Sequence, residues 1–390
     1  MKKIKLAIVN NFPTPYRIPI FDKFADDPAF ETRIFLTGTE RHTRERWVLN
    51  DSKTREYIVG LPGIGIRIHD KTADRVFFNP GFSRITSWKP DVVLILGYKD
   101  ITNWIVALMC CLRRIPYVLV VDVTSQGGRT VTGRLSLPLV HWIVSNASHL
   151  VPSSKSGEGF LLNHGGSPDR ITVIPNVPDI SRLFAISNQM HARGTQTRKE
   201  FGLTGKFVVF FVGRLTEYKG VRELLEAIDM ASRIKQNLEL LIVGDGPLKP
   251  EVEGFSGNHP QSAKYVGSVD EETLHRLYAI ADVHVMPSHA EAFGLVCPEA
   301  MAFGVPSIVT RTSGCADLIV DGENGLLIEP CDASGLSAAI LKLASDPTML
   351  AKMRINASKT AAGITSDRIQ RQIKEIVQKV TKASESCAAD

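Results

Sequence analysis

The chain has 390 residues, of which 44% are hydrophobic and 22% charged, the composition of an ordinary globular protein with two or more domains. It contains no run of 18 uncharged apolar residues, so a transmembrane helix is not expected. Residues 1–10 are basic and then briefly apolar without a cleavage site, which predicts a first strand and not a signal peptide. The six cysteines form no CxxC pair and have no histidine at metal-binding spacing, which predicts reduced thiols in a cytoplasmic protein.

The net charge of +5 is divided unevenly, with +8 over residues 1–190 and −3 over the remainder. A basic half suggests an anionic partner, either a substrate or the surface of a membrane with anionic lipids. No basic strand is interleaved with aromatic residues and no zinc module is present, so nucleic acid is not an expected partner.

Apolar strands and helical patterns alternate along residues 1–180. The expected strands lie at 3–10, 32–36, 65–69, 91–96, 117–121, 149–152 and 171–174. The expected helices lie at 15–24, 73–88, 100–113, 133–146 and 154–163. Fully apolar strands indicate a sheet covered on both faces, and the alternation indicates parallel strands with right-handed crossovers.

Residues 181–203 are polar without a sustained period, which predicts a linker between domains. The alternation resumes over residues 204–366, with strands at 207–212, 238–243, 263–266, 282–287, 307–310 and 326–328. Helices are expected at 221–234, 271–281, 298–304 and from 315, and a long charged helix at 367–382. The predicted fold class is α/β, with two Rossmann-like, doubly wound parallel-sheet domains at 1–180 and 204–366.

Two glutamates mark a strand–loop–helix segment in the second half, Glu291 and Glu299. They are eight residues apart, and positions i and i+8 of a helix diverge by about 80°, so the two side chains cannot share one helix face. Glu291 is therefore expected in the loop and Glu299 inside the helix. The start of that helix favours an anion through its free N–H groups, although a glutamate there is also an ordinary partner of the helix dipole.

The carboxyl ends of three predicted strands should meet at one edge of the second sheet, because the strands are expected to be parallel. Ligands of such sheets bind at this edge. These ends carry the segments 213–214, 244–247 and 291–294. Arg214 and Lys219 would neutralise a diphosphate without a metal, and the chain contains no Asp-x-Asp metal motif. Glu299 would accept both hydroxyls of a ribose. For Arg214 a salt bridge to Glu217 is the alternative, for Lys219 a solvated side chain, and for residues 244–247 a plain turn.

Taken together, these motifs resemble the family 4 retaining glycosyltransferases of the two-domain GT-B fold. The resemblance covers roughly residues 205–330 and depends on the order and spacing of Gly213-Arg214, Lys219-Gly220, Gly244-Asp-Gly-Pro247, Glu291-x7-Glu299, Gly304-Val-Pro306 and Asp321-Gly-x-x-Gly325. It implies two domains facing across a cleft, with a nucleotide-diphosphate sugar, UDP being the expected nucleotide, on the C-terminal domain and an acceptor on the N-terminal domain. It also implies retention of anomeric configuration, with departure and attack on one face of the sugar.

The same resemblance implies roles for individual residues. Arg214 and Lys219 would bind the diphosphate and stabilise the leaving charge, Glu299 would hold the ribose, and Glu291 would contact the transferred sugar. The implied donor-binding set is Arg214, Lys219, Gly244, Gly246, Phe293, Gly294, Leu295, Val296 and Glu299. No metal or other cofactor is expected, and the final helix would pack back on the N-terminal domain.

The N-terminal half departs from the family pattern at two places. Residues 10–17 replace a Gly-Gly loop and resemble a Pro-Tyr-Arg variant of enzymes of bacterial surface-polysaccharide assembly. Tyr16 and Arg17 would lie on the acceptor side, with Arg17 facing a phosphate or, alternatively, solvent. Asp122 stands near the place of a frequent histidine, and it either serves catalysis near the acceptor hydroxyl or caps a strand. The expected acceptor is a glycan or a saccharide linked to polyprenyl diphosphate.

Residues 133–144 join an apolar stretch containing Trp142 to the basic residues Arg129 and Arg134. This segment is either an ordinary core helix or a peripheral contact with the inner face of an anionic membrane.

Two further functions remain open from the sequence. One is another GT-B enzyme, such as a nucleotide-sugar epimerase or a phosphorylase-like enzyme, although no obvious pyridoxal lysine motif is visible. The other is a non-catalytic protein that binds a nucleotide sugar. Turnover without an acceptor would favour an epimerase, and tight binding without turnover would favour the binding protein.

Overall fold

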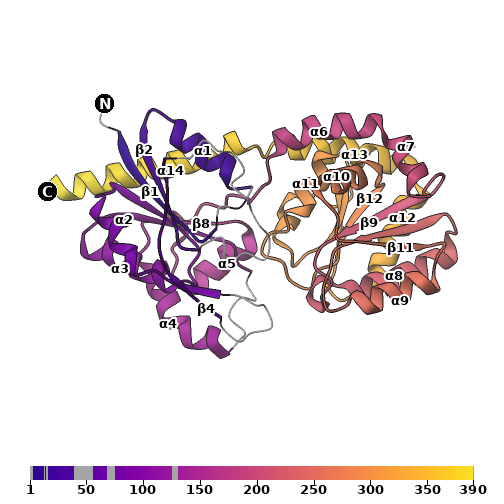
Figure 1. Cartoon of the computed structure of the whole chain (residues 1–390), viewed down its shortest axis with the longest axis horizontal. Helices are drawn as coiled ribbons and strands as arrows, with labels where there is room; N and C mark the ends of the chain where they lie inside the picture. The colour runs from indigo at the N-terminus through magenta and orange to yellow at the C-terminus, as the bar shows by residue number, and fades with distance from the viewer. Residues whose placement is uncertain are drawn as a thin grey trace. The chain divides into compact units, whose positions relative to one another are not determined.

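The structure is a computed structural model, and it describes residues 3–12, 14, 16–38, 56–67, 75–124 and 131–389. The chain separates into two compact units. The first comprises residues 1–175 together with 366–390, and the second comprises residues 176–365. Figure 1 traces the elements of each unit. Within the described ranges, no helix has an apolar stretch long enough to span a bilayer.

The first unit is built on a six-stranded sheet in the order β3-β2-β1-β6-β7-β8, and all neighbouring strands are parallel. Each residue of the central strand β6 is buried, as its apolar sequence predicts for a sheet covered on both faces. The strands are β1 Ile4–Asn10, β2 Phe30–Leu36, β3 Ile58–Gly60, β6 Val92–Leu96, β7 Tyr117–Val121 and β8 His149–Pro152.

Helices cover this sheet, among them α3, α4 and α5, which contribute to one core cluster. α5 begins after Ser154, whose hydroxyl accepts a hydrogen bond from the amide of Gly157, as expected for a helix cap. The helices of the unit are α1 Ile18–Asp26, α2 Ser83–Ser87, α3 Ile101–Leu112, α4 Val131–Ser145, α5 Lys155–Asn163 and α14 Ser366–Ala389.

The last helix, α14, packs against α1 of the first unit (Figure 1). Its buried residues recur at helical spacing, which gives the helix one apolar stripe: Ile369, Ile373, Ile376, Val377 and Val380. Ion pairs of 2.6 Å join Lys23 to Asp367 and Lys374 to Asp27. Burial acts to raise the pKa of Asp27, but the hydrogen bonds from Lys374, the amide of Ala29 and Gln370, together with the charge of Lys374, outweigh it and lower the pKa.

Two predictions for the first unit are wrong. Residues 73–88 do not form one helix: β5 Arg75–Phe78 pairs with β4 Ile64–Arg67 as a separate antiparallel ribbon, followed by the turn η2 Pro80–Phe82 and the short α2. Pro80 forces the preceding Asn79 into an extended conformation, which stops a helix there. Residues 171–174 form no strand, since only Ile171 bridges Leu150, although the amides of Thr172 and Ile174 still bond to the edge strand β8.

The second unit also has a six-stranded parallel sheet, in the order β11-β10-β9-β12-β13-β14. The predicted α/β class with two doubly wound parallel sheets is therefore confirmed. The strands are β9 Phe207–Val212, β10 Leu238–Val243, β11 Ala263–Gly267, β12 Val283–Met286, β13 Ser307–Thr310 and β14 Gly325–Ile328.

Helices lie on both faces of the second sheet (Figure 1). α8 and α12 pack in one core cluster, and α6, α10 and α11 pack in the other. The helices are α6 Ile180–Ala192, α7 Gly194–Glu200, α8 Val221–Ile234, α9 Lys249–Asn258, α10 Glu271–Ile280, α11 Val296–Ala302, α12 Ala333–Ser345 and α13 Pro347–Ala362, and the turn predicted as a helix from residue 315 is the short η5 Gly314–Leu318.

The linker predicted at residues 181–203 is also wrong, because these residues form α6 and α7 of the second unit. A few apolar positions are enough to dock them, including the buried Ile180, Leu183 and Leu203. Arg198 adds a polar anchor, since its guanidinium donates to the carbonyl of Ile280 and pairs with Asp282 at 2.9 Å. Tertiary contacts of this kind override a weak helical pattern.

Candidate functional site

The predicted residues of the second unit gather at the carboxyl edge of its sheet. β9 lies between β10 and β12, so the loops that leave these three strands are neighbours. These loops carry Arg214, Gly244 and Glu291, respectively. The strand order reverses at β9, and such a reversal opens a crevice in which ligands of doubly wound sheets bind.

The loops after β9 and β10 pack backbone against backbone. The amide of Leu215 donates to the carbonyl of Asp245, and the amide of Leu248 donates to the carbonyl of Leu215, each at 2.9 Å. Gly244 has φ +137°, and a Cβ at this position would lie 1.9 Å from the carbonyl oxygen of Gly213. Only glycine permits this approach. Gly244 and Gly246 thus position the two loops, and their contact with a donor stays a prediction.

Lys219 and Glu291 form an ion pair at this edge. Lys219 ends the turn η4 Glu217–Lys219, and Glu291 lies in the loop between β12 and α11. The two side chains are only 18% and 19% exposed, so the solvated lysine considered from the sequence is not what the structure shows.

Backbone hydrogen bonds hold the Glu291 loop from two sides. The amide of Gly314 donates to the carbonyl of Glu291 at 2.9 Å, and the amide of Cys315 donates to that of Phe293 at 2.7 Å. On the other side, the amide of His289 donates to the carbonyl of Tyr218 at 2.8 Å. The Lys219–Glu291 pair is therefore fixed by the backbones of both segments that carry it.

Glu299 lies in the first turn of α11, as predicted. The hydroxyl of Tyr278 donates to its carboxyl oxygen at 2.9 Å. Burial of the carboxyl raises the pKa of Glu299 to about 7, against the opposing effect of the Tyr278 hydrogen bond. A carboxyl held near neutrality at a sheet edge is more typical of a functional group than of a simple dipole partner.

Arg214 is exposed at the same edge and makes no ion pair with any residue that the structure describes. The alternative salt bridge to Glu217 is not formed, because Glu217 pairs with Arg222 at 2.7 Å. Arg222 in turn pairs with Glu251 at 2.8 Å. Arg214 is thus a cation available to a ligand.

The residues that lead into α11 have distinct positions. Phe293 is buried and anchors the loop. Gly294 has φ +93°, and a Cβ there would lie 2.7 Å from the sulfur of Met286. Leu295 precedes the helix and Val296 begins it, so their amides have no acceptor in the first turn. Of the four, Phe293 shapes the loop, while the others offer backbone to a ligand.

The acceptor-side candidates of the first unit also come together. Arg17 pairs with Asp122 at 2.9 Å and donates to the side-chain carbonyl of Asn10 at 2.8 Å. The guanidinium lies 5.5 Å from the centre of the Tyr16 ring, a cation–π distance. Arg17 is only 16% exposed, so the alternative of a fully solvated arginine is wrong. Residues 125–130 of the loop after Asp122 lie outside the described residues.

The sequence did not reveal the partners that fix these groups. Tyr278 lies within the helix predicted at 271–281, but periodicity gave no sign that its hydroxyl would meet a carboxyl. Asn10 ends the predicted first strand, and its contact with Arg17 spans only seven residues of sequence. Asn10 is a polar residue at a strand end, which is a signal that the sequence offers, whereas Tyr278 lies near the end of α10 and has no such signal.

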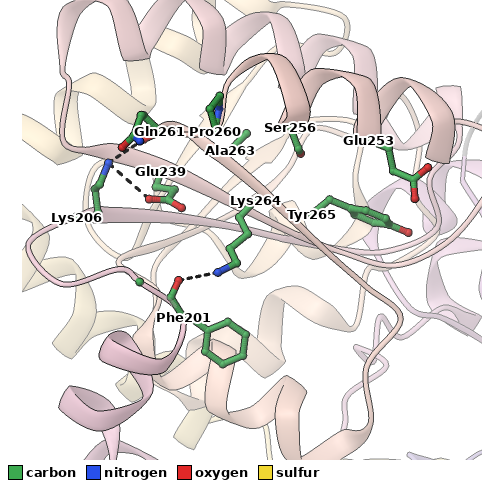
Figure 2. A pocket seen from close by; sticks show the side chains of 11 residues that line it. Phe201, Lys206, Glu239, Glu253, Ser256, Pro260, Gln261, Ala263, Lys264 and Tyr265 are labelled. Carbon is green, nitrogen blue, oxygen red and sulfur yellow. Dashed lines mark hydrogen bonds and ion pairs between the residues drawn. The ribbon is translucent and has the colours of Figure 1, made fainter.

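A hollow of about 570 Å³ lies at the opposite, amino edge of the second sheet, where β9 and β10 begin. Figure 2 shows its two lysines: Lys206 reaches Gln261 and Glu239, and Lys264 reaches the carbonyl of Phe201. None of the predicted site residues lines this hollow. Among the described residues, the group that could hold a metal is Glu223, His289 and Cys331, none of which belongs to the predicted set.

Comparisons with known families match both halves of the chain. The family described as "Glycosyl transferases group 1" matches residues 194–360, and the one described as "Glycosyl transferase 4-like domain" matches residues 33–177. Together the two matches take in most of the chain and the candidate residues of the second unit.

Curated relatives support the same assignment. A glycogen synthase from Mycobacterium tuberculosis is 29% identical over 293 residues, which are 72% of this chain and 66% of the relative. A D-inositol 3-phosphate glycosyltransferase from Corynebacterium efficiens is 30% identical over 254 residues, which are 62% of this chain and 58% of the relative. The chain thus spans about two thirds or less of the length of these relatives.

Among solved structures, HepE from Anabaena in complex with UDP has a TM-score of 0.72 with 19% identity, over 97% of this chain and 100% of the other. At this identity the likeness establishes the shared fold.

The first prediction concerns Glu299. Its pKa is raised from 4.5 to about 7, so the folded state binds more protons than the unfolded state between these values. The carboxyl therefore contributes stability below about pH 4.5 that is lost as pH rises through about 7, about 3 kcal/mol in all. Glu299→Gln should lose less free energy of unfolding than wild type between pH 5 and 8, measured by urea denaturation. The exposed Glu272→Gln on α10 is the control, and equal slopes for wild type and Glu299→Gln would contradict the assignment.

The second prediction concerns the Lys219–Glu291 pair. Lys219→Met and Glu291→Gln each leave a partly buried charge without its partner and should lower the free energy of unfolding by about 1–3 kcal/mol. In a double-mutant cycle, the coupling should be about 1 kcal/mol. The exposed pair Lys249–Glu253, at 3.7 Å, is a matched control with an expected coupling below about 0.5 kcal/mol. Equal couplings in the two pairs would show that Lys219 and Glu291 interact no more strongly than surface charges.

Proposed function

The chain belongs to the family 4 glycosyltransferases, and we propose that it moves a sugar from a nucleotide-diphosphate sugar to a glycan or polyprenyl-diphosphate-linked acceptor with retention of configuration. The observation that carries this proposal is the set of groups at the carboxyl edge of the second sheet. Arg214, which forms no ion pair with any described residue, lies at the same edge as the Lys219–Glu291 pair and the carboxyl of Glu299, whose pKa is raised to about 7. In this proposal the cations complement the diphosphate, Glu291 the transferred sugar and Glu299 the ribose.

In the proposed donor complex, the charges divide between two ends of the nucleotide sugar. Arg214 and Lys219 face the diphosphate, where charge-assisted hydrogen bonds are strongest. The amides of Leu295 and Val296 add donors for the same anion. Glu299 accepts the two ribose hydroxyls, and Tyr278 keeps its carboxyl oriented. The cations neutralise the leaving group in this scheme, and no step is assigned to a metal.

The transfer itself breaks the bond between the anomeric carbon and the diphosphate oxygen and forms a bond from that carbon to the acceptor oxygen. Both events occur on one face of the sugar, and the acceptor proton passes to the departing diphosphate. Charge develops on the leaving oxygen, so Arg214 and Lys219 stabilise the transition state more than the ground state. Glu291 holds Lys219 in place and contacts a sugar hydroxyl.

On the acceptor side, we assign Asp122 to a hydrogen bond from the acceptor hydroxyl. One terminal nitrogen of the Arg17 guanidinium lies 2.9 Å from the carboxylate of Asp122 and orients it, and the other donates to the side-chain carbonyl of Asn10 at 2.8 Å. The excess of positive charge over residues 1–190 suits an acceptor with a phosphate or diphosphate, or an anionic membrane that carries it. The helix α4 is a weaker support for membrane contact, because Val140, Ile143 and Val144 are buried in the core.

UDP is the proposed nucleotide. HepE from Anabaena, a protein of the same fold, is also solved in complex with UDP-glucose. Pocket shape decides the base, and small differences in hydrogen bonding can change it.

Nucleotide binding tests the donor site. UDP at 100 times its Kd should stabilise the wild type by about 2.7 kcal/mol, which a thermal-shift assay detects. Lys219→Ala and Glu299→Ala should each weaken UDP binding about 10- to 100-fold, as expected for the loss of a charged hydrogen bond. The exposed Lys199→Ala and Glu272→Ala are matched controls that should bind as wild type does. Unchanged affinity in both site variants would overturn the donor site.

The pH dependence of binding tests the ribose contact. The ionised Glu299 accepts two hydroxyl hydrogen bonds, whereas the protonated carboxyl keeps less acceptor capacity. Because the pKa of Glu299 is about 7, UDP affinity in wild type should rise between pH 6 and 8. Glu299→Gln should show a flat profile, measured by calorimetry. A wild-type profile that is equally flat would remove Glu299 from the nucleotide site.

Separate variants test the acceptor side. Asp122→Asn and Arg17→Ala should lower kcat/KM for the acceptor about 10- to 1,000-fold while leaving the Kd for UDP unchanged. Sugar transfer is measured with the nucleotide sugar that binds best. The anomeric configuration of the product shows whether the configuration of the donor is retained. Loss of UDP affinity in Arg17→Ala would instead assign Arg17 to the donor diphosphate.

A further inference from the structure

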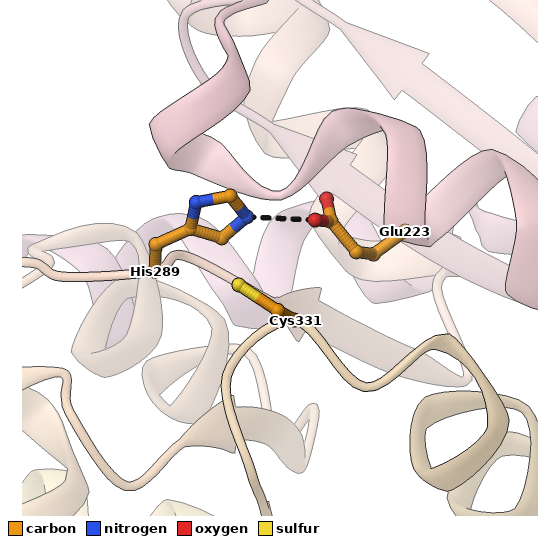
Figure 3. A group of neighbouring side chains, drawn as sticks. All are labelled: Glu223, His289 and Cys331. Carbon is orange, nitrogen blue, oxygen red and sulfur yellow. Dashed lines mark hydrogen bonds and ion pairs between the residues drawn. The ribbon is translucent and has the colours of Figure 1, made fainter.

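Three side chains with metal-binding atoms meet in the second unit, close to the Glu291 loop. Glu223 lies in the first turn of α8, His289 follows β12, and Cys331 lies between β14 and α12. Their ligand atoms all lie within 4.8 Å of one another. Figure 3 shows the imidazole and the carboxylate in contact, with the sulfur of Cys331 turned toward them.

The spacing of the three ligand atoms is close to what an ion with tetrahedral coordination requires. Nε2 of His289 lies 2.8 Å from Oε1 of Glu223, so this ring nitrogen already faces the carboxylate. Zinc holds nitrogen, oxygen and sulfur ligands at about 2.0–2.3 Å, which puts pairs of ligand atoms about 3–4 Å apart. The three atoms would need small side-chain rotations to bind one ion, which would replace the proton between Nε2 and Oε1.

The backbone of Cys331 gives a second reason to assign the group a role. Cys331 has φ +57°, a left-handed conformation that glycine adopts freely and other residues rarely do. Its side chain is exposed, and those of His289 and Glu223 are 33% and 22% exposed, so an ion can reach all three from solvent. An ordinary histidine–carboxylate pair accounts for Glu223 and His289, but it does not account for a thiol held beside them at a strained position.

We propose that Glu223, His289 and Cys331 bind one zinc-like divalent ion, with a water molecule in the fourth position. One imidazole, one thiolate and one carboxylate are the ligand types that zinc accepts. Magnesium and calcium prefer oxygen ligands alone and are not expected here. The site is not visible in the sequence, because the ligands lie 66 and 42 residues apart and no short motif joins them.

An ion at this site would clamp the segments that carry the proposed donor groups. Glu223 belongs to the helix that follows Lys219, and His289 lies two residues before Glu291. The amide of His289 already bonds to the carbonyl of Tyr218. Zinc would add a further link between the same two segments and raise their resistance to unfolding. This effect requires only metal binding and is independent of the transfer reaction.

Titration of the reduced, metal-free full chain with Co²⁺ and Zn²⁺ tests the site. One equivalent of Co²⁺ should give a thiolate-to-cobalt charge-transfer band. Added Zn²⁺ should displace the Co²⁺ and remove the band. Zn²⁺ should also raise the melting temperature and slow alkylation of Cys331, followed by mass spectrometry. Cys331→Ser should abolish the band and weaken Zn²⁺ binding by about 100-fold or more. Even the loss of a residue that only hydrogen-bonds to a metal ligand lowers metal affinity about 10- to 100-fold. Glu223→Gln should weaken binding without removing the thiol.

Two matched variants separate this site from adventitious binding. Cys111→Ser removes a thiol elsewhere, and His259→Gln removes a histidine that pairs with Asp229 at 3.3 Å and belongs to no such three-ligand group among the described residues. Both should bind Co²⁺ and Zn²⁺ as wild type does. Absence of saturable binding in wild type, or equal binding by wild type and Cys331→Ser, would overturn the proposal. Circular dichroism of each variant establishes that loss of binding does not come from loss of fold.

Discussion

The parallel order of β10, β9 and β12 is the constraint on which the proposed donor site depends. Parallel strands send their following loops to one edge, and the reversal of strand order at β9 separates the helices that would otherwise cover it. Glu291 follows Lys219 by 72 residues, yet this order brings the loops that carry Arg214, Lys219 and Glu291 to the same edge. The close contact of Gly244 with Gly213 then sets how far apart two of the loops can lie. The strand order thus brings the loops together, and the side chains on those loops then determine the chemistry of the site.

Some charged groups at this edge are shielded from water, which is unfavourable unless nearby groups compensate. Lys219 and Glu291 are both largely shielded from water and balance each other. Among the residues that the structure describes, Glu299 has no cationic partner; the hydroxyl of Tyr278 donates a hydrogen bond to its carboxyl, and burial raises its pKa to about 7. A carboxyl in this state gains when hydroxyl donors approach it, whereas a fully paired one would not. The carboxyl of Glu299 can therefore accept further hydrogen bonds, which the ribose hydroxyls of the proposed donor would donate.

Local patterns predicted most of the fold, and tertiary contacts decided the rest. Buried strands and the Glu291–Glu299 segment follow from apolar runs and helix geometry, so both glutamates lie where the sequence places them. The helix expected at 73–88 fails because Pro80 enforces an extended Asn79. The linker expected at 181–203 fails because docking on α10 and α11 stabilises helices of weak pattern. Partners across long sequence distances, such as Tyr278 for Glu299, leave no local signal.

A structure of the protein with a bound UDP-sugar tests the central claim most directly. We expect the ribose hydroxyls within hydrogen-bond distance of Glu299 and the diphosphate against Arg214 and Lys219, at the carboxyl edge of the second sheet. A nucleotide bound elsewhere would contradict the account, for example in the hollow at the amino edge near Lys206 and Lys264. In that case, the topological argument for the donor site would fail even though the family assignment stands.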